Sequence, residues 1–364
     1  MFDRRLITHF DWFLLLMVLL VAVAGIVNIY SATHSWGNAV PFYQRQICWL
    51  GAGLVIALLC CLFDYRWLRR WAWPLYCGAV LMLAGVFLFG KVAMGARRWI
   101  RLGFFNLQPS EIVKIVIIVI LARYFSKRNA ERECTLVDML ISGILLAIPC
   151  GLILKQPDLG TSMLVLAIGM TIVLFNPIRW QVLALMGGGG AVAMCVGWSF
   201  LHDYQKSRIY TFLNPERDPL RAGYHIIQSK IAVGDGGFWG RGFLQGSQAQ
   251  LSFLPERHTD FAFSVFAEEW GFIGSAALLL AYLLIVLWGI FIAYRAPDLF
   301  GRYLAIGVTA MLFWHIAINL GMVIGLMPVV GVPLPLFSYG GTSMITTMVG
   351  VGLLLNVSMR RFIF

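Results

Sequence analysis

Continuous apolar runs, most of them close to the length that crosses a lipid bilayer, limit how this chain can fold more than any other feature. They cover about 12 to 30, 47 to 63, 72 to 90, 109 to 126, 136 to 154, 159 to 175, 180 to 201, 261 to 293, 301 to 325 and 336 to 357. A helix of about 20 apolar residues spans the hydrocarbon core. A closed β-barrel needs alternating strands, which the continuous run Ile112 to Leu121 contradicts. The runs predict an all-α, polytopic membrane protein with ten transmembrane helices.

The composition supports the same class. Of the 364 residues, 60% are hydrophobic and 12% are charged, and the mean hydropathy is +0.81. A soluble domain of this size does not have that balance. The seven cysteines show no CxxC spacing, so neither a disulfide framework nor a zinc site is predicted. The net charge of +11 fits attraction to anionic lipid headgroups, and no pattern favours nucleic-acid binding.

The distribution of Lys and Arg predicts the orientation. Ten spans put both termini on one side, and the termini and short loops of that side hold 14 Lys and Arg residues, against six in the opposite short loops. Cytoplasmic loops carry the excess of positive charge, so both termini are predicted to be cytoplasmic. The long loop from about 202 to 260, between the seventh and eighth helices, would lie outside. Residues 1–364 would form a single membrane domain.

A polar segment with Glu256, His258 and Asp260 joins directly onto the eighth apolar run. Ionisable side chains are therefore expected where a membrane helix meets water at the outer side. Ionisable residues at such positions are candidates for a functional site, because they are costly to keep near lipid. The position suits a substrate that has one polar end and one apolar end.

Two groups of charged residues near the fourth helix allow alternative interpretations. Arg98 and Arg101 flank Trp99 in the preceding outer loop. They either anchor the chain at the membrane interface or bind phosphate through the forked guanidinium donors. Glu111 and Lys114 lie at i and i+3 on one helical face. This pair either neutralises itself and locks helices together or contacts substrate.

The outer hairpin between the fifth and sixth helices contains Asp158. This carboxylate either caps the sixth helix or is a second outer carboxylate beside Asp260. Further along, the loop Leu326 to Pro335 is apolar and broken by prolines. It is expected to fold back against the helices, because irregular backbone at membrane depth needs protein partners. Ser338 then begins the tenth helix at the outer level.

The long outer loop contains many glycines between Gly223 and Gly246 but lacks the GKS or GKT end of a nucleotide phosphate loop. Its backbone NH groups could approach an anion or a sugar closely. Residues Ile226 to Val233 are predicted to form a short amphipathic helix on the membrane surface. This helix would offer the polar side chains of Gln228 and Ser229.

Together these residues resemble the SEDS (shape, elongation, division and sporulation) family of peptidoglycan glycosyltransferases. The matching segments are Pro109-Ser110-Glu111 with Lys114, Gln156 to Thr161, Gln228-Ser229, Leu254-Pro255-Glu256 with His258 to Phe261, and Asn319, Gly325 to Pro328, Gly331, Pro333 to Pro335 and Ser338 to Ser343. The amino-acid sequences of these segments are more similar to the elongation branch of the family than to its division branch.

The resemblance implies that the chain polymerises lipid II, a disaccharide-peptide on undecaprenyl pyrophosphate, at the outer face of the bacterial cytoplasmic membrane. The essential aspartate of the family falls on Asp260, which would be the general base in an inverting displacement. The conserved charged pair falls on Glu111 and Lys114, and the other outer carboxylate on Asp158. The pyrophosphate would be held by Arg or Lys, the candidates being Arg208, Lys114, Arg98 and Arg101.

Further substrate contacts are expected from Gln228, Ser229, Glu256, His258 and Ser338. A divalent cation such as Mg²⁺ could share the neutralisation of the pyrophosphate, although no tight cluster of ligands is evident. The resemblance also implies a class B penicillin-binding protein as partner. Two other functions fit a polytopic protein of this kind: a lipid II flippase, and a scaffold without catalytic activity.

Overall fold

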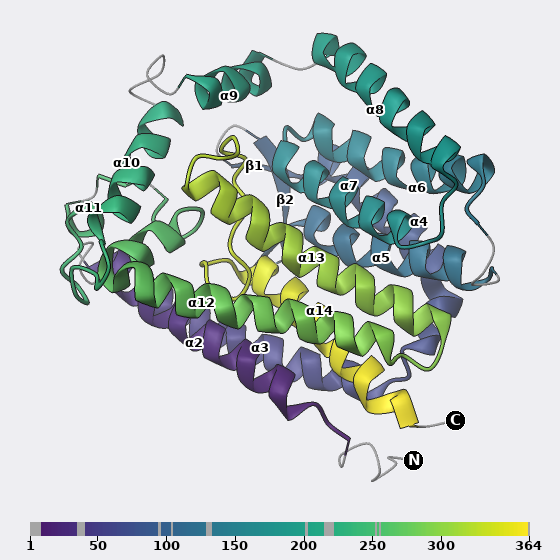
Figure 1. The fold of residues 1–364 in the computed structure, drawn as a ribbon, viewed down its shortest axis with the longest axis horizontal. Helices are drawn as coiled ribbons and strands as arrows, with labels where there is room; N and C mark the ends of the chain where they lie inside the picture. The colour runs from purple at the N-terminus through teal and green to yellow at the C-terminus, as the bar shows by residue number, and fades with distance from the viewer. Residues whose placement is uncertain are drawn as a thin grey trace.

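The computed structural model describes residues 9–34, 41–93, 96–102, 105–128, 133–200, 203–214, 222–251, 253–254 and 256–362. Most of the long helices run side by side in a bundle, from which α8 stands apart, and α2 begins at the end of the bundle where α14 ends (Figure 1). The long helices are α2 (Trp12–Thr33), α3 (Phe42–Leu62), α4 (Arg66–Phe89), α5 (Pro109–Ser126), α6 (Leu136–Lys155), α7 (Leu159–Leu174), α8 (Trp180–Phe200), α12 (Ala262–Tyr294), α13 (Leu299–Val323) and α14 (Gly341–Met359). The predicted apolar runs therefore fall on helices, with bounds that differ by a few residues.

Seven helices in the described part of the chain are long and apolar enough to cross a membrane, namely α2, α3, α4, α6, α12, α13 and α14. This confirms a multi-pass membrane protein. Helix α7 is only 16 residues long, and α5 carries Glu111, Lys114 and Arg123 within its 18 residues. Length and hydropathy alone therefore identify fewer spans than the ten that the apolar runs predict.

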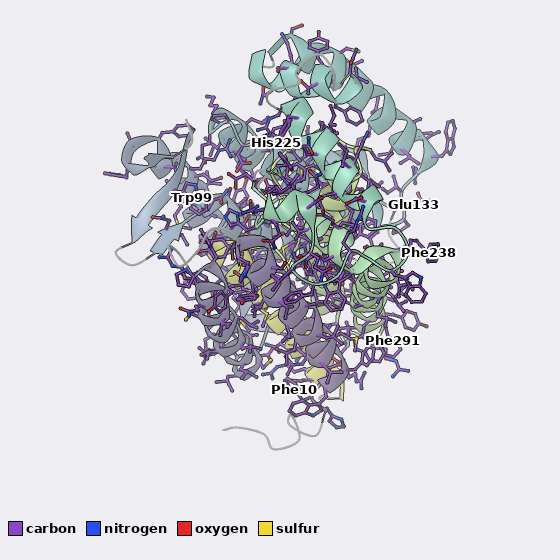
Figure 2. The ribbon with its side chains drawn as sticks, turned by 90° about the vertical axis from the view of Figure 1, so that its left-hand side faces the viewer. Phe10, Trp99, Glu133, His225, Phe238 and Phe291 are labelled. Carbon is purple, nitrogen blue, oxygen red and sulfur yellow. The ribbon has the colours of Figure 1, made fainter. Side chains whose placement is uncertain are left out.

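The chain is mostly helical, as predicted, but a small sheet that the apolar runs do not predict lies between α4 and α5. Three short strands, β1 (Lys91–Ala93), β2 (Ala96–Leu102) and β3 (Phe105–Leu107), form an antiparallel sheet in the order β1-β2-β3. The aromatic and β-branched residues of β2 favour a strand, and Trp99 lies at the rim of the molecule (Figure 2). The sequence predicts an outer loop for this segment, because the strands are too short to give a clear alternating pattern.

Helices α5 and α13 form the centre of the bundle. In α5, apolar residues are buried on every side, because α4, α7, α13 and α14 all pack against it. Small residues allow this close approach, since a Cβ on Gly307 of α13 would overlap Ile118 of α5. Glu111 and Lys114 of α5 are therefore held between protein helices, away from lipid.

Three shorter helices follow α8 at one end of the bundle: α9 (Asp203–Leu213), α10 (Ala222–Asp235) and α11 (Ser247–Gln250) (Figure 1). Residues Ile226 to Val233 are helical, as predicted, and form part of α10, which buries Ile226, Ser229 and Ala232 against α12 and α13. Their position relative to the membrane surface stays a prediction. The loop expected outside the membrane is therefore largely helical and docks on the bundle.

The apolar loop between α13 and α14 folds back against the helices, as predicted. The Val329 carbonyl accepts from Arg208 Nη1 at 2.8 Å, and the Pro335 carbonyl accepts from Tyr282 Oη at 2.6 Å. Side chains of other elements thus satisfy backbone groups that lipid could not. The loop lies against the beginning of α12, where Asp260 is found.

Candidate active site

The candidate site lies where α5, α7, α12 and α14 all begin, at one end of the bundle (Figure 1). Two contacts tie these helix starts together. Gln108, which precedes α5, donates from Nε2 to Asp158 Oδ2 at 3.1 Å, and Asp158 caps α7. The Tyr339 amide, before α14, donates to the His258 carbonyl, before α12, at 2.9 Å. Helix N-termini carry partial positive charge, so this end of the bundle favours an anionic ligand.

Asp260 is positioned by a tight turn just before α12. The amides of Thr259 and Phe261 both donate to the Glu256 carbonyl, at 3.1 and 3.3 Å, and Glu256 itself has a φ of 49°. Asn319 Nδ2 of α13 donates to the Asp260 carbonyl at 2.9 Å. The main chain of Asp260 is therefore fixed from both sides.

The carboxyl group of Asp260 lies close to the loop after α13. A Cβ on Gly331 would be 3.4 Å from Asp260 Oδ2, so the glycine backbone forms one wall of the site. Burial raises the pKa of Asp260 to about 7, and the charge of Glu256 adds to this rise, while Arg208 opposes it. A carboxyl with a pKa near neutrality is suited to general-base catalysis at physiological pH.

Glu111 and Lys114 form a buried ion pair, with Lys114 Nζ 2.7 Å from Glu111 Oε1. A third residue, His315 of α13, contacts the same ammonium, because its Nε2 lies 2.8 Å from Lys114 Nζ. Both members of the pair are almost fully buried. The structure thus confirms the ion pair. Replacing either member with an uncharged residue would leave the other charge buried without its partner.

Helix α13 connects this ion pair to Asp260. His315 and Asn319 lie four residues apart, so they share one face of the helix. His315 contacts Lys114, while Asn319 donates to the Asp260 carbonyl and to the Val332 carbonyl at 2.7 Å. One rigid helix therefore sets the separation between the buried ammonium and the candidate base.

Asp158 caps α7, as one of the two interpretations predicted. Its Oδ1 accepts from the Thr161 amide at 3.2 Å, and its Oδ2 accepts from Thr161 Oγ1 at 2.9 Å. The same carboxylate lies near enough to Asp260 that its charge contributes to raising the pKa of Asp260. Asp158 is therefore both the cap of α7 and a second carboxylate near Asp260.

The predicted arginines differ in what they contact. Arg208 donates to the Val329 carbonyl, and its charge acts on Asp260. Arg98 donates from Nε to the Gln156 carbonyl at 3.0 Å and from Nη2 to the Pro157 carbonyl, so it braces the hairpin before α7. The backbone of Arg101 pairs within the sheet, and its side chain lies outside the described part.

Glu256 and His258 line the approach to Asp260. Glu256 is exposed and accepts from Thr259 Oγ1 at 3.0 Å. The ring of His258 packs between Phe42, at a centroid distance of 4.7 Å, and Tyr339, at 5.8 Å. Burial lowers the pKa of His258, which favours the neutral imidazole. These positions are compatible with substrate contact.

The remaining predicted contacts mostly stabilise the protein itself. Ser229 Oγ lies 2.8 Å from Ser264 Oγ and donates to the Val323 carbonyl at 2.7 Å, so it anchors α10. Ser338 Oγ accepts from the Leu334 amide at 3.0 Å, which closes a turn before α14. Gln228 is half-buried on α10. Near it, His225 of α10 stacks on Phe261 with ring centroids 6.0 Å apart, so α10 covers the residue after Asp260.

The glycines of the long loop have another use than the predicted approach to an anion or a sugar. Helix α12 is broken at Gly271, and the carbonyls of Glu268 and Glu269 there accept from the Arg241 and Gly242 amides, at 2.9 and 3.0 Å. A Cβ on Gly240, whose φ is 84°, would overlap the Glu269 carbonyl. The amides of Arg241 and Gly242 therefore donate to carbonyls at the break in α12.

Several residues of this network were not singled out from the sequence, chiefly His315 and Gln108. A signal for His315 was present, because an ionisable residue within an apolar helix is a functional candidate by default. Its spacing of four from Asn319 also indicated a shared face. Nothing local indicated Gln108, whose role depends on the hairpin that carries Asp158.

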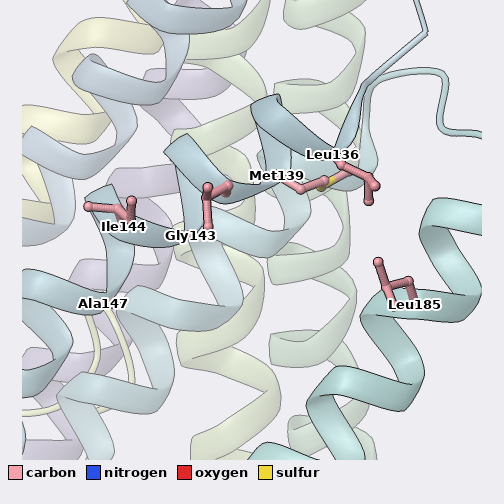
Figure 3. A pocket seen from close by; sticks show the side chains of 7 residues that line it. Leu136, Met139, Gly143, Ile144, Ala147 and Leu185 are labelled. Carbon is pink, nitrogen blue, oxygen red and sulfur yellow. The ribbon is translucent and has the colours of Figure 1, made fainter.

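An apolar groove with a volume of about 520 Å³ lies elsewhere, along α6. Figure 3 shows Leu185 of α8 opposite Leu136, Met139 and Gly143 of α6. None of the ionisable residues described above lines this groove. The candidate site is therefore defined by the polar contacts around Asp260.

Known proteins with similar sequences and structures cover nearly the whole chain. The profile of the FtsW/RodA/SpoVE cell cycle proteins matches residues 10–362. The peptidoglycan glycosyltransferase MrdB of Escherichia coli is 42% identical, over 97% of this chain and 94% of its own. The peptidoglycan glycosyltransferase RodA of Treponema pallidum is 34% identical, over 98% and 99%.

Two solved structures are also similar. A chain from a peptidoglycan synthase complex that coordinates polymerization and crosslinking has a TM-score of 0.83 at 35% identity, covering 98% of this chain and 99% of that one. The rod shape determining protein RodA of Thermus thermophilus has a TM-score of 0.72 at 32% identity, covering 97% and 98%.

Proposed function

Because this chain belongs to the FtsW/RodA/SpoVE family of peptidoglycan glycosyltransferases, we propose that it polymerises lipid II into β1,4-linked glycan strands during cell elongation. Relatives named MrdB and RodA over the full length support the elongation role. The reaction takes place, in this proposal, at the outer face of the cytoplasmic membrane.

The observation that carries the proposal is the environment of Asp260. Burial raises the pKa of its carboxyl to about 7, and Asn319 holds its main-chain carbonyl at the mouth of α12. In the proposed reaction, the acceptor sugar hydroxyl attacks the anomeric carbon of the donor and its proton passes to Asp260. The bond between that carbon and the pyrophosphate oxygen breaks at the same time. One displacement inverts an α-linked donor to a β1,4 product without a covalent enzyme intermediate.

The leaving pyrophosphate needs neutralisation of its charge more than it needs a proton. Lys114 and Arg208 are the cations that we assign to it, and the four helix N-termini add partial positive charge. In the part of the chain that the structure describes, no three His, Cys, Asp or Glu side chains gather to hold a metal ion. A divalent cation such as Mg²⁺ would therefore be bound chiefly by the pyrophosphate itself.

The substrate contacts proposed from the sequence divide into two groups. Glu111, Asp158, Glu256 and His258 remain contacts of the polar headgroup, since all four lie at the outer helix ends around Asp260. Arg98, Arg101, Gln228, Ser229 and Ser338 form the outer part of the site in this proposal. The contacts of Ser229 and Ser338 within the protein indicate that they shape the site more than they bind.

The proposed topology has ten membrane spans, with α5, α7 and α8 added to the seven apolar helices. The burial of α5 among other helices explains why it tolerates charge inside the bundle. Both termini are cytoplasmic, and the loop from about 202 to 260 lies outside. The whole chain, 1–364, forms one membrane domain.

The proposed partner is a class B penicillin-binding protein that crosslinks the new strands. The similarity to a chain of a complex that coordinates polymerization and crosslinking supports this assignment. Polymerised product from purified protein and lipid II, with and without the partner, tests the function. If the purified protein transports lipid II across vesicle membranes but makes no polymer, the chain is a flippase and the proposed enzymatic function is wrong.

A further inference from the structure

His315 lies in the middle of the membrane helix α13 and is almost fully buried. Its Nδ1 is 2.6 Å from the Met311 carbonyl, one turn earlier on the same helix. A carbonyl oxygen can only accept, so Nδ1 carries the hydrogen. The other ring nitrogen, Nε2, then presents a lone pair, and Lys114 Nζ lies 2.8 Å from it.

This tautomer makes the imidazole an acceptor for the ammonium of Lys114. An ammonium has three N–H donors. Among the described residues, Glu111 Oε1 takes one and His315 Nε2 takes another. Two acceptors on different helices fix the direction of the third N–H, which a single i,i+3 partner could not do.

Polar atoms without protein partners surround the ion pair and α13. Glu111 Oε2 and Ser110 Oγ, at the start of α5, are buried and have no hydrogen-bond partner in the described part of the chain. Asn319 Oδ1, on the same face of α13 as His315, is also buried without one. Buried polar atoms without described partners therefore lie on both helices that hold the Lys114 ammonium, at the start of α5 and one turn beyond His315 on α13.

We propose that His315 is a positioning residue, which holds the Lys114 ammonium on the face of α13 that also carries Asn319 and hence Asp260. The inference rests on the proposed function, in which Lys114 neutralises the leaving pyrophosphate. Because α13 sets the separation between the two groups, a small shift of the ammonium weakens charge stabilisation in the transition state. Misplacement of a reacting or stabilising group by about 1 Å costs about 100-fold in rate.

The test compares His315→Leu and His315→Gln in lipid II polymerisation, with rates normalised to folded protein by thermal unfolding. Leu has a similar size but no acceptor, whereas Gln keeps an acceptor oxygen. Positioning predicts that His315→Leu lowers kcat by about 10- to 100-fold with little change in KM. His315→Gln is expected to recover most of this loss.

Simple packing of an apolar helix predicts the opposite order, with Leu tolerated better than Gln. Thr309→Val is the matched control, since Thr309 Oγ1 donates only to its own helix, at the Ala305 carbonyl (2.8 Å). It is expected to leave the rate unchanged. If His315→Leu does not fold, His315→Asn replaces it, because the shorter amide withdraws the acceptor from Lys114.

Activity of His315→Leu equal to wild type, or no recovery with Gln, would overturn the positioning role. Failure of the proposed function gives different results. If the proposed function is wrong, wild-type protein makes no polymer, or Asp260→Asn polymerises lipid II as fast as wild type.

Discussion

Replacing Asp260 with Asn removes the proposed proton acceptor and keeps the shape of the side chain. Loss of a general base lowers the rate by about 10² to 10⁴ fold, while folding and lipid II binding survive. In the wild type, the base works as a carboxylate and burial raises its pKa to about 7. The rate kcat/KM is therefore expected to fall about tenfold for each pH unit below about 7.

The same pKa has a consequence for stability. The folded protein favours the protonated carboxyl, because the pKa is about 7 in the fold and 3.8 in an unperturbed aspartate. Ionisation of Asp260 therefore destabilises the folded protein. This loss of stability is absent below about pH 3.8, grows as the pH rises, and is complete above about pH 7. The full shift corresponds to about 4 kcal/mol at 1.36 kcal/mol per unit. Asp260 as a whole is only half-buried, and solvent screening therefore reduces the expected loss of stability to roughly 1–2 kcal/mol.

Asp260→Asn is accordingly expected to be more stable than wild type at pH 8, and to lose this advantage as the pH falls towards 4. The assays are polymer formation and thermal unfolding of purified protein over a pH series, with Glu256→Gln as the control. A flat rate profile between pH 5.5 and 8 would refute the raised pKa. Near wild-type turnover by Asp260→Asn, together with an inactive Glu256→Gln, would move the base to Glu256.

Three further predictions concern the ion pair, the kink and the topology. Glu111→Ala and Lys114→Ala are each expected to lower the free energy of unfolding by about 3–5 kcal/mol, and the double change to regain part of the stability without regaining polymerisation. Gly240→Ala is expected to cost roughly 1–3 kcal/mol in thermal unfolding, because its φ of 84° and the Glu269 carbonyl leave no room for Cβ. With native cysteines removed, a cysteine at exposed Ser247 is expected to react with an impermeant thiol reagent in spheroplasts, and one at exposed Lys127 is not.

Each of these predictions has a contrary result. Full activity of a folded double variant would make the ion pair purely structural. Gly234→Ala is the control for the kink, since nothing lies within 4 Å of its Cβ, and an equal loss in both glycine variants would refute the packing argument. Labelling at Lys127 but not at Ser247 would invert the topology.

The sequence by itself determined the class of protein and most helix positions. A membrane allows few solutions for long apolar runs, because every backbone polar group must be satisfied inside the chain. For α5 the predicted range, 109 to 126, equals the observed one, since Pro109 starts the helix and charge ends it. Periodic local signals of this kind do not depend on what packs nearby.

Local sequence patterns predict element boundaries less well where hydrogen bonds to other segments determine the backbone conformation. The apolar run predicts a tenth helix from 336, but the helix begins at Gly341, because Ser338 closes a turn with the Leu334 amide. The strands β1 to β3 pair with one another over short distances, and their apolar content was attributed to a loop. In both places hydrogen bonds, rather than hydropathy, set the boundary.

The site shows the same division between local and tertiary causes. Asp260, Glu111 and Lys114 were identifiable in the sequence, because ionisable residues beside apolar runs are rare and costly. That His315 accepts from Lys114, 201 positions away in the chain, follows only from the packing of α5 against α13. The raised pKa of Asp260 likewise results from burial by segments far apart in sequence. Tertiary contacts decided these properties, because desolvation and charge act through space and not along the chain.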